Sequence, residues 1–132
     1  MSNITPVAQI ESLARAPLDP QVLSVRKTVQ RLQIEMLVPA DLAYFQGHFP
    51  TQPILPGVAQ ILWVARFVQR WLAPSMIFQH MDRVKFKSLI YPGDELMLDV
   101  RCIPTGVSYQ YLRAGRVVGS GYLISGSDET SA

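Results

Sequence analysis

Polar and apolar residues alternate along much of the chain with the two-residue period of a β-strand. Polar and apolar residues alternate between Val22 and Val38, most regularly where Leu32, Ile34, Met36 and Val38 are spaced two apart, and the phase slips near Gln30 or Arg31. A slip of one residue turns the following side chains to the opposite face of a sheet. The pattern therefore predicts strand structure in this range, with a bulge or a turn at the slip.

Four further segments in the second half of the chain have strand patterns, and turn-forming residues separate them. Each turn contains a glycine, which favours a tight change of direction. The predicted strands are Met81 to Ile90, Glu95 to Ile103, Val107 to Leu112 and Val117 to Ser125, and the turns are Tyr91-Pro92-Gly93-Asp94, Pro104-Thr105-Gly106 and Ala114-Gly115.

The segment from Val58 to Leu72 has a different pattern, because it lacks glycine and proline and is followed by Pro74. Its polar residues Arg66, Gln69 and Arg70 are spaced three and four apart, so they share one narrow face of a helix. The rest of its surface is apolar nearly all round. We expect a helix of about four turns that is buried over most of its surface.

One long apolar helix followed by several antiparallel strands packs well when the sheet curls around the helix. The predicted fold class is therefore α+β, in the hotdog arrangement. A length of 132 residues fits one domain. We expect an irregular lead-in over residues 1–20, a single domain over residues 21–126 and a flexible tail over residues 127–132.

Composition and charge narrow the functional classes. Hydrophobic residues make up 48% of the chain and charged residues 17%, which indicates extra apolar surface and hence an oligomer. The net charge is +2 and no basic run is longer than Arg26-Lys27, which disfavours nucleic-acid binding. The single cysteine, Cys102, can form no internal disulfide, and the longest apolar run, Ile61 to Ala65, is too short to span a bilayer. We expect a cytoplasmic protein without membrane insertion.

The loop from Pro39 to Pro56 carries the candidate chemistry. Its prolines restrict the backbone, so a side chain such as His48 can be held in place at low entropic cost. Gly57 lets a ligand approach the backbone, and the first N–H groups of a helix have no partner within it. These donors could hold a thioester carbonyl while an imidazole transfers a proton. On these residues alone, His48 is either a catalytic group or a packed core histidine.

Several motifs in and after this loop resemble those of a known family. The family is that of the bacterial 3-hydroxyacyl-acyl carrier protein dehydratases, which are hotdog enzymes of fatty acid synthesis. The motifs resemble the active-site signature of these enzymes and the strand and turn that follow it. The stretch from Leu55 to Trp63 is more similar to a divergent ApeI-like branch associated with aryl polyene pathways. The resemblance covers about residues 25–125, and its motifs are Gly47-His48-Phe49-Pro50, Pro53, Pro56-Gly57-Val58, Lys85-Phe86-Lys87 and Pro92-Gly93-Asp94.

The resemblance implies a reaction and a set of site residues. His48 would be the general base that removes the α-proton of a 3-hydroxyacyl thioester, and the Gly57 N–H would hold the thioester carbonyl. An acyl carrier protein or coenzyme A would carry the substrate. The site would lie between the subunits of a homodimer or higher homo-oligomer. The resemblance implies no metal or redox cofactor. Residues expected to line the substrate site are Phe49, Pro56, Val58, Gln60, Leu62 and Trp63, although core packing is the default interpretation of Trp63.

One position departs from the family pattern. The dehydratases carry an acidic residue on the central helix, fourteen positions after the histidine, to handle the departing hydroxyl, and here that position is Leu62. No aspartate or glutamate occurs between Asp41 and Asp82, and the amide of Gln60 could orient water or the hydroxyl but is no general acid. Three interpretations stay open: a dehydratase, a thioesterase in which His48 activates water, and a non-catalytic acyl-binding subunit.

Overall fold

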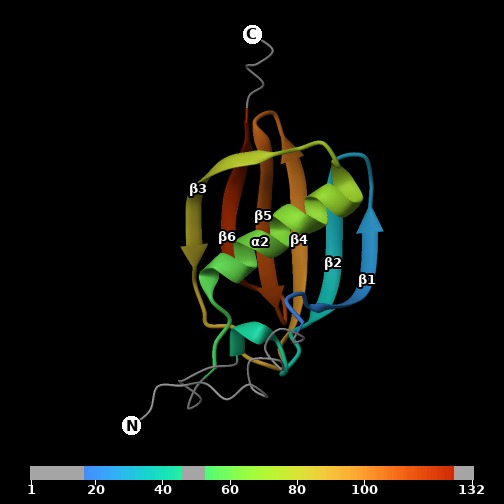
Figure 1. Cartoon of the computed structure of the whole chain (residues 1–132). Coiled ribbons are helices and arrows are strands. Elements are labelled where there is room, and N and C mark those ends of the chain that lie inside the picture. The colour runs from blue at the N-terminus through green and yellow to red at the C-terminus, as the bar shows by residue number, and fades with distance from the viewer. Residues whose placement is uncertain (1–16, 46–52, 127–132) are drawn as a thin grey trace, which may run out of the picture.

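The computed structural model describes residues 17–45 and 53–126, which form one antiparallel sheet and a central helix (Figure 1). The six strands follow the order β1-β2-β4-β5-β6-β3 across the sheet. They are β1 (Gln21–Lys27), β2 (Arg31–Leu37), β3 (Phe78–Phe86), β4 (Glu95–Ile103), β5 (Gly106–Arg113) and β6 (Arg116–Ser125). Between β2 and β3 lie the short 3₁₀ turn η1 (Ala43–Phe45), the helix α2 (Gly57–Phe67) and its π-helical continuation η2 (Val68–Leu72).

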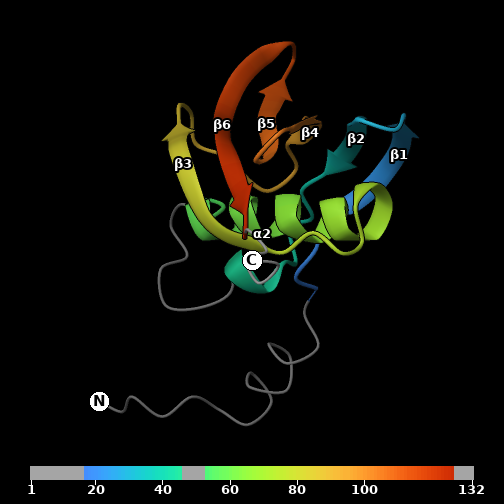
Figure 2. The ribbon, with the colours of Figure 1, turned by 90° about the horizontal axis from the view of Figure 1, so that it is seen from above.

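The sheet curves around α2, which lies across one face of it (Figure 2). This arrangement confirms the predicted α+β hotdog fold. The dimer remains a prediction at this point, because the structure contains a single chain. The expected division into lead-in, domain and tail also remains a prediction, since residues 1–16 and 127–132 lie outside the described part of the chain.

The predicted phase slip near Gln30 is a turn between two strands. β1 ends at Lys27, β2 begins at Arg31, and the Thr28 N–H donates to the Arg31 carbonyl at 2.9 Å. Strand β4 has the predicted bounds, and β5 and β6 agree with prediction to within one residue at each end. Turn composition and alternation together were sufficient to locate these strands.

Strand β3 differs from its prediction. It spans Phe78–Phe86, whereas the pattern placed it at Met81 to Ile90. The chain leaves the strand ladder after β3, and the Lys87 N–H donates to the Val118 carbonyl at 2.9 Å. Ile90 is fully buried although it lies beyond the end of the strand. Its apolar character therefore reflects packing outside the sheet, which the two-residue period cannot distinguish from a longer strand.

The core lies between α2 and the concave face of the sheet. Strands β2, β4 and β5 direct alternate residues toward the helix, as a pleated sheet requires. Each large apolar side chain buried there stabilises the fold by about 1.5–3 kcal/mol. The largest fully buried side chains include Trp63, Tyr111, Leu32, Ile34, Met36, Leu42, Ile90 and Leu98.

The loop before the helix is apolar and partly buried, as predicted, where the structure describes it. Leu42 and Leu55 are buried, and Tyr44 and Phe45 pack against the core. Ile54 is an exception, because it is exposed. The described ends of this loop are therefore anchored in the core on both sides of residues 46–52.

The expectation that the helix is buried nearly all round is wrong in its first turns. Val58 is 59% exposed and Leu62 is 41% exposed, and Arg66 continues the same face at a spacing of four residues. The physical reason is that the sheet covers only one side of α2, so the opposite side faces solvent in the single chain. Within residues 17–45 and 53–126, no helix has the length and apolar character needed to cross a membrane.

Candidate active site

The start of α2 is fixed by the two residues that precede it. Leu55 is buried, and its N–H donates to the Ile90 carbonyl at 2.8 Å, which ties the loop to the segment after β3. Pro56 has an extended backbone with φ −64° and ψ 147°, and its carbonyl accepts the N–H of Ala59 at 3.0 Å. Since proline has a restricted φ, this residue sets the direction in which the helix begins at Gly57.

Two backbone donors are open at this helix start. The N–H groups of Gly57 and Val58 have no hydrogen-bond partner among the described residues. They belong to the first N–H groups of the helix, which have no carbonyl partner within it, and they carry the positive end of the helix dipole. They are therefore suited to an oxygen that gains negative charge, such as a thioester carbonyl during enolate formation.

The ring of Phe86 covers Gly57. A Cβ atom at residue 57 would lie 2.5 Å from Cζ of this ring, so only glycine fits there without displacing it. Phe86 is the last residue of β3 and is 53% exposed, so its ring forms an apolar wall over the helix start. Such a wall lowers the local dielectric constant, which strengthens a hydrogen bond from the backbone to a charged oxygen.

Gln60 is a buried polar residue three positions after Gly57. It is 4% exposed, and its Oε1 has no hydrogen-bond partner among the described residues. Gly119 leaves space for this amide, because a Cβ at residue 119 would lie 3.0 Å from Oε1. An unpaired buried polar group costs about 1–3 kcal/mol of stability. A contact with a ligand would offset this cost.

Tyr111 holds the backbone of α2 beside this amide. Its O–H donates to the Gln60 carbonyl at 2.6 Å. Burial raises the pKa of Tyr111 well above its ordinary value, and the neighbouring Tyr109 adds to the shift. The phenol therefore stays protonated at neutral pH and remains a hydrogen-bond donor. This hydrogen bond fixes the distance between the first turn of α2 and the sheet.

Leu62 lies on the exposed side of the helix, one turn beyond Val58. No acidic side chain is available nearby on the helix, because the sequence of α2 contains neither aspartate nor glutamate. Val58, Leu62 and Phe86 are all exposed and apolar, and we call these three side chains the helix-start surface. Position 62, for which the family resemblance implies an acid, is therefore part of an open apolar surface.

The structure brings together some of the predicted site residues. Pro56, Gly57 and Val58 meet at the helix start, Gln60 points toward the sheet and Leu62 toward solvent. The three remaining predicted site residues, His48, Phe49 and Trp63, are not part of this group.

Two of those residues, His48 and Phe49, lie outside the described residues. Trp63 is fully buried, and its indole N–H donates to the Leu18 carbonyl at 2.8 Å. This contact agrees with the default interpretation of Trp63 as a core residue. Its role in lining an acyl tunnel stays a prediction.

Sequence reasoning missed two residues of this site. Phe86 lies within the Lys85-Phe86-Lys87 motif, but nothing in its spacing indicated that the ring covers Gly57. The contact between Tyr111 and Gln60 joins residues 51 positions apart. Strand alternation could have placed Tyr111 on the core face, but it could not have identified its partner.

A comparison with protein families decides the affiliation of the chain. The family model described as ApeI-like, the ApeI dehydratase, matches residues 24–122, about three quarters of the sequence. The chain belongs to this family. The ApeI-like resemblance that the loop motifs indicate is thereby confirmed.

Curated relatives of the ApeI-like chain include 3-hydroxyacyl-[acyl-carrier-protein] dehydratases named FabZ. The protein from Clostridium beijerinckii is 37% identical over 68 residues, which cover 46% of this chain and 48% of the relative. The protein from Roseiflexus sp. strain RS-1 is 39% identical over 82 residues, which cover 54% of this chain and 55% of the relative. The chain thus spans about half the length of the curated relatives it matches.

Solved structures support the same family and fold. A chain of the dehydratase heterocomplex ApeI:P from Xenorhabdus doucetiae has a TM-score of 0.78 and 29% identity over 83% of this chain and 99% of that one. An uncharacterized protein from Erwinia carotovora subsp. atroseptica has a TM-score of 0.72 and 31% identity, over 81% of this chain and 95% of that one. Mouse thioesterase superfamily member 2 has a TM-score of 0.62 at 14% identity, over 80% of this chain and 88% of that one, and this likeness shows the fold alone.

Proposed function

We propose that the protein dehydrates a 3-hydroxyacyl chain carried on acyl carrier protein and releases the trans-2-enoyl thioester, in fatty acid or aryl polyene biosynthesis. The observation that carries the proposal is the pair of open N–H groups at Gly57 and Val58 beside the ring of Phe86. His48 precedes Gly57 by nine residues, in the signature of the family. Membership of the ApeI-like family and the names of the FabZ relatives support this substrate class.

The reaction needs a base, an oxyanion site and an acid. His48 takes the proton from C2 of the acyl chain, and the Gly57 N–H stabilises the charge that moves onto the thioester oxygen. The electron pair then forms the C2–C3 double bond as the C3–O bond breaks. The hydroxyl leaves as water with a proton from solvent or from an acid of a partner subunit, and the imidazolium of His48 returns its proton to solvent. Leu62 cannot supply the proton for the hydroxyl, and the lack of a positioned acid slows such a step by about 10² to 10⁴.

We infer that a second hotdog subunit covers the helix-start surface. Val58, Leu62 and Phe86 are exposed beside β3, which is an edge strand of the sheet. An unpaired strand edge next to apolar side chains favours association with another chain. A homodimer is the simplest assembly and would have Leu62 in both subunits. The related ApeI chain is part of a heterocomplex, and a partner with an acid at the equivalent position would restore the missing group.

Product analysis separates this function from its rivals. Purified protein is incubated with 3-hydroxyacyl carrier proteins that bear alkyl or aryl chains, with and without a dehydratase subunit that carries the helix acid. Mass spectrometry then identifies the products. We expect loss of one water molecule per acyl chain. A free acid and a thiol would instead indicate a thioesterase, in which His48 activates water.

Two histidine variants supply the matched comparison. His48→Ala should lower the rate of water loss by about 10² to 10⁴, as expected for removal of a general base. His80→Ala removes the other histidine, which is exposed on β3, and should retain the wild-type rate. Substrate that stays intact under every condition, with or without the acid-bearing subunit, would leave only the non-catalytic binding role.

A further inference from the structure

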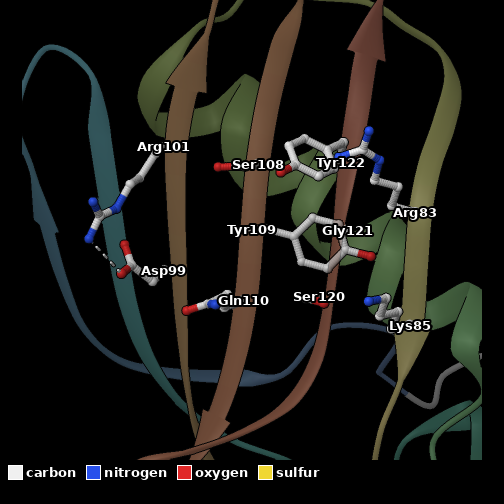
Figure 3. A pocket seen from close by; sticks show the side chains of 10 residues that line it. All are labelled: Arg83, Lys85, Asp99, Arg101, Ser108, Tyr109, Gln110, Ser120, Gly121 and Tyr122. Carbon is white, nitrogen blue, oxygen red and sulfur yellow. Dashed lines mark ion pairs between the residues drawn. The ribbon is translucent and has the colours of Figure 1, made fainter.

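A cavity lies on the face of the sheet that points away from α2. It has a volume of about 560 Å³ and extends across β4, β5, β6 and β3 (Figure 3). Its floor carries Ser108, Gln110 and Ser120, Arg101 stands on one side, and Arg83 and Lys85 stand on the other. Residues directly opposite in an antiparallel pair share a face, and the pairs Arg101↔Ser108, Gln110↔Ser120 and Ser120↔Lys85 therefore form one continuous polar surface.

A bulge in β3 shapes one side of this cavity. Asp82 pairs with Tyr122 and Lys85 pairs with Ser120, so two residues of β3 face a single residue of β6 between these pairs. Arg83, one of the two, has a φ of 52°, which is uncommon for a residue other than glycine. Bulges re-aim side chains and are frequent next to binding sites. Here the guanidinium of Arg83 lies 5.8 Å from the ring centroid of Tyr122.

The positive charge on the β3 side is poorly compensated. Arg83 has one ion pair among the described residues, a contact of 3.9 Å with Asp82, and both side chains are largely exposed. Lys85 has none among the described residues. Asp99 on the opposite side is already engaged, because Arg31 donates two hydrogen bonds to it at 3.0 Å and Arg101 lies 3.7 Å from it. Two cations are thus left for a ligand.

Tyr109 contributes a hydroxyl from the helix-facing side of β5, because its side chain alternates with those of Ser108 and Gln110. It lines the cavity, is only 3% exposed, and its hydroxyl has no hydrogen-bond partner among the described residues. Figure 3 shows that the hydroxyl points toward β3. Gly121 makes this position possible, because a Cβ there would lie 2.9 Å from the hydroxyl oxygen. Burial raises the pKa of Tyr109 to about 12, so the phenol remains a donor near neutral pH.

We propose that this cavity binds a phosphate ester, with the phosphate between Arg83 and Lys85 and a hydroxylated body over Ser108, Gln110 and Ser120. Cations bind phosphate through short charge-assisted hydrogen bonds, and the neutral floor offers both donors and acceptors to hydroxyl groups. Four adjacent strands span about 14 Å at about 4.8 Å per spacing, which suits a small elongated ligand. The volume of about 560 Å³ also falls in the range of small-molecule sites.

The cavity is separate from the thioester site, because the sheet lies between the two. Arg101, Ser108 and Ser120 face away from α2, whereas Gly57 and Gln60 lie on the helix itself. The proposal therefore does not rest on the dehydration chemistry. A ligand could occupy the cavity whether or not the protein turns over thioesters.

The test is a nuclear magnetic resonance titration of the full-length ¹⁵N-labelled protein at constant ionic strength. The probes are inorganic phosphate and ribose 5-phosphate, with ribose and sodium chloride as controls. We expect saturable shifts of the amide signals of residues 83–85, 108–110 and 120–122. Ribose 5-phosphate should bind more tightly than phosphate alone, because the body contacts the floor. Equal affinity for the two would overturn the proposed role of the floor and reduce the site to an adventitious ion site.

Variants of matched charge decide whether the cavity is responsible. The pair Arg83→Gln and Lys85→Gln should weaken ribose 5-phosphate at least tenfold. The pair Arg26→Gln and Arg116→Gln removes the same charge from exposed positions outside the cavity and should leave the affinity unchanged. Ser120→Leu fills the floor without a change of charge and should also abolish binding of the ester. Equal losses in both charge pairs, or retention of binding in all variants, would refute the proposal.

Discussion

Leucine at position 62 places an apolar side chain where the proposed reaction needs a proton donor. In the single chain the side chain is 41% exposed, so a longer polar residue fits there without disturbing the core of the subunit. Surface substitutions of this kind usually change stability by no more than about 0.5 kcal/mol. Position 62 can therefore be altered chemically with little effect on the fold.

We predict that Leu62→Glu accelerates water loss from a 3-hydroxyacyl carrier protein by tenfold or more, approaching the 10² to 10⁴ typical of a positioned acid. Leu62→Gln has a similar shape but cannot donate a proton as a carboxylic acid does, so its rate should remain at the wild-type value. The rates are measured by mass spectrometry of the acyl chain. Equal rates for the two variants would show that a missing acid does not limit the reaction.

Gly57 is sensitive to substitution because the ring of Phe86 lies beside it. Gly57→Ala places a Cβ within 2.5 Å of that ring, so either the ring or the helix start must move. Because the ring of Phe86 is half exposed and can move aside, we predict a loss of no more than about 1 kcal/mol in the free energy of unfolding, measured by urea denaturation. Activity should fall with it, because the Gly57 N–H changes position.

The double variant Gly57→Ala with Phe86→Ala identifies the cause. If the clash with the ring is responsible, removal of the ring should recover most of the stability lost in Gly57→Ala, measured relative to Phe86→Ala alone. Such coupling between contacting residues is typically about 0.5–3 kcal/mol. Additive effects of the two substitutions would contradict the contact.

At the level of elements, the turn between β3 and β4 holds the start of the helix in register with the sheet. The carboxylate of Asp94 accepts the Tyr91 N–H and a guanidinium N–H of Arg113, both at 2.8 Å. Its carbonyl accepts the Val38 N–H at 2.9 Å. Ile90 in the same segment binds the loop before α2, so the turn and the site are mechanically connected.

We expect Asp94→Ala to lower the free energy of unfolding by about 1–3 kcal/mol, because it removes two hydrogen bonds and leaves Arg113 without its carboxylate. Asp94→Asn keeps an oxygen for the Tyr91 N–H and should cost less. Both values come from urea denaturation. An equal cost for the two variants would mean that the ion pair, and not the turn contact, accounts for the stability.

Elements bounded by distinct turns were predictable from the sequence. Strands β4 and β5 alternate between polar and apolar residues, and glycine-containing turns separate β4, β5 and β6, so local patterns were enough to find these three strands. Strand β3 was shifted because Ile90 continues the apolar pattern for a tertiary reason. The exposed side of α2 was also missed, since the sequence does not show whether an apolar residue of the helix faces the sheet or a partner.

The candidate site was predictable as far as it depends on local backbone. Prolines before Gly57 indicated the helix start, and the absence of an acid at Leu62 was visible directly. The inward direction of Gln60 and the contact of Phe86 with Gly57 depend on how β3 and β6 pack against α2. Those contacts join residues distant in sequence, and no spacing rule specifies them.

For the molecule as a whole, two buried phenols make stability depend on alkaline pH. Burial raises the pKa of Tyr109 to about 12 and that of Tyr111 well above its ordinary value. Below pH 10 both phenols are protonated in the folded and the unfolded chain, so their contribution is fully present. Above pH 10 the unfolded chain ionises first, and stability falls by up to about 1.4 kcal/mol per pH unit for each tyrosine.

The measurement is the free energy of unfolding in urea at several pH values from 8 to above 11. Tyr109→Phe removes one of the two ionisable groups, so the decline of its stability above pH 10 should be shallower than that of the wild type. At pH 8 the two proteins differ only by a constant offset. Identical slopes above pH 10 would show that Tyr109 ionises as easily in the folded chain as in the unfolded chain.

The two edges of the sheet, β1 and β3, limit how far copies of this chain can associate. When the β3 edges of two copies pair by two-fold symmetry, neither copy has a free β3 edge left for a further chain. The remaining β1 edges carry exposed Arg26 and Lys27 and an irregular register between Val22 and Ser24, features that oppose further strand addition. We therefore expect self-limiting assemblies and no fibrous growth through the sheet, even at high protein concentration.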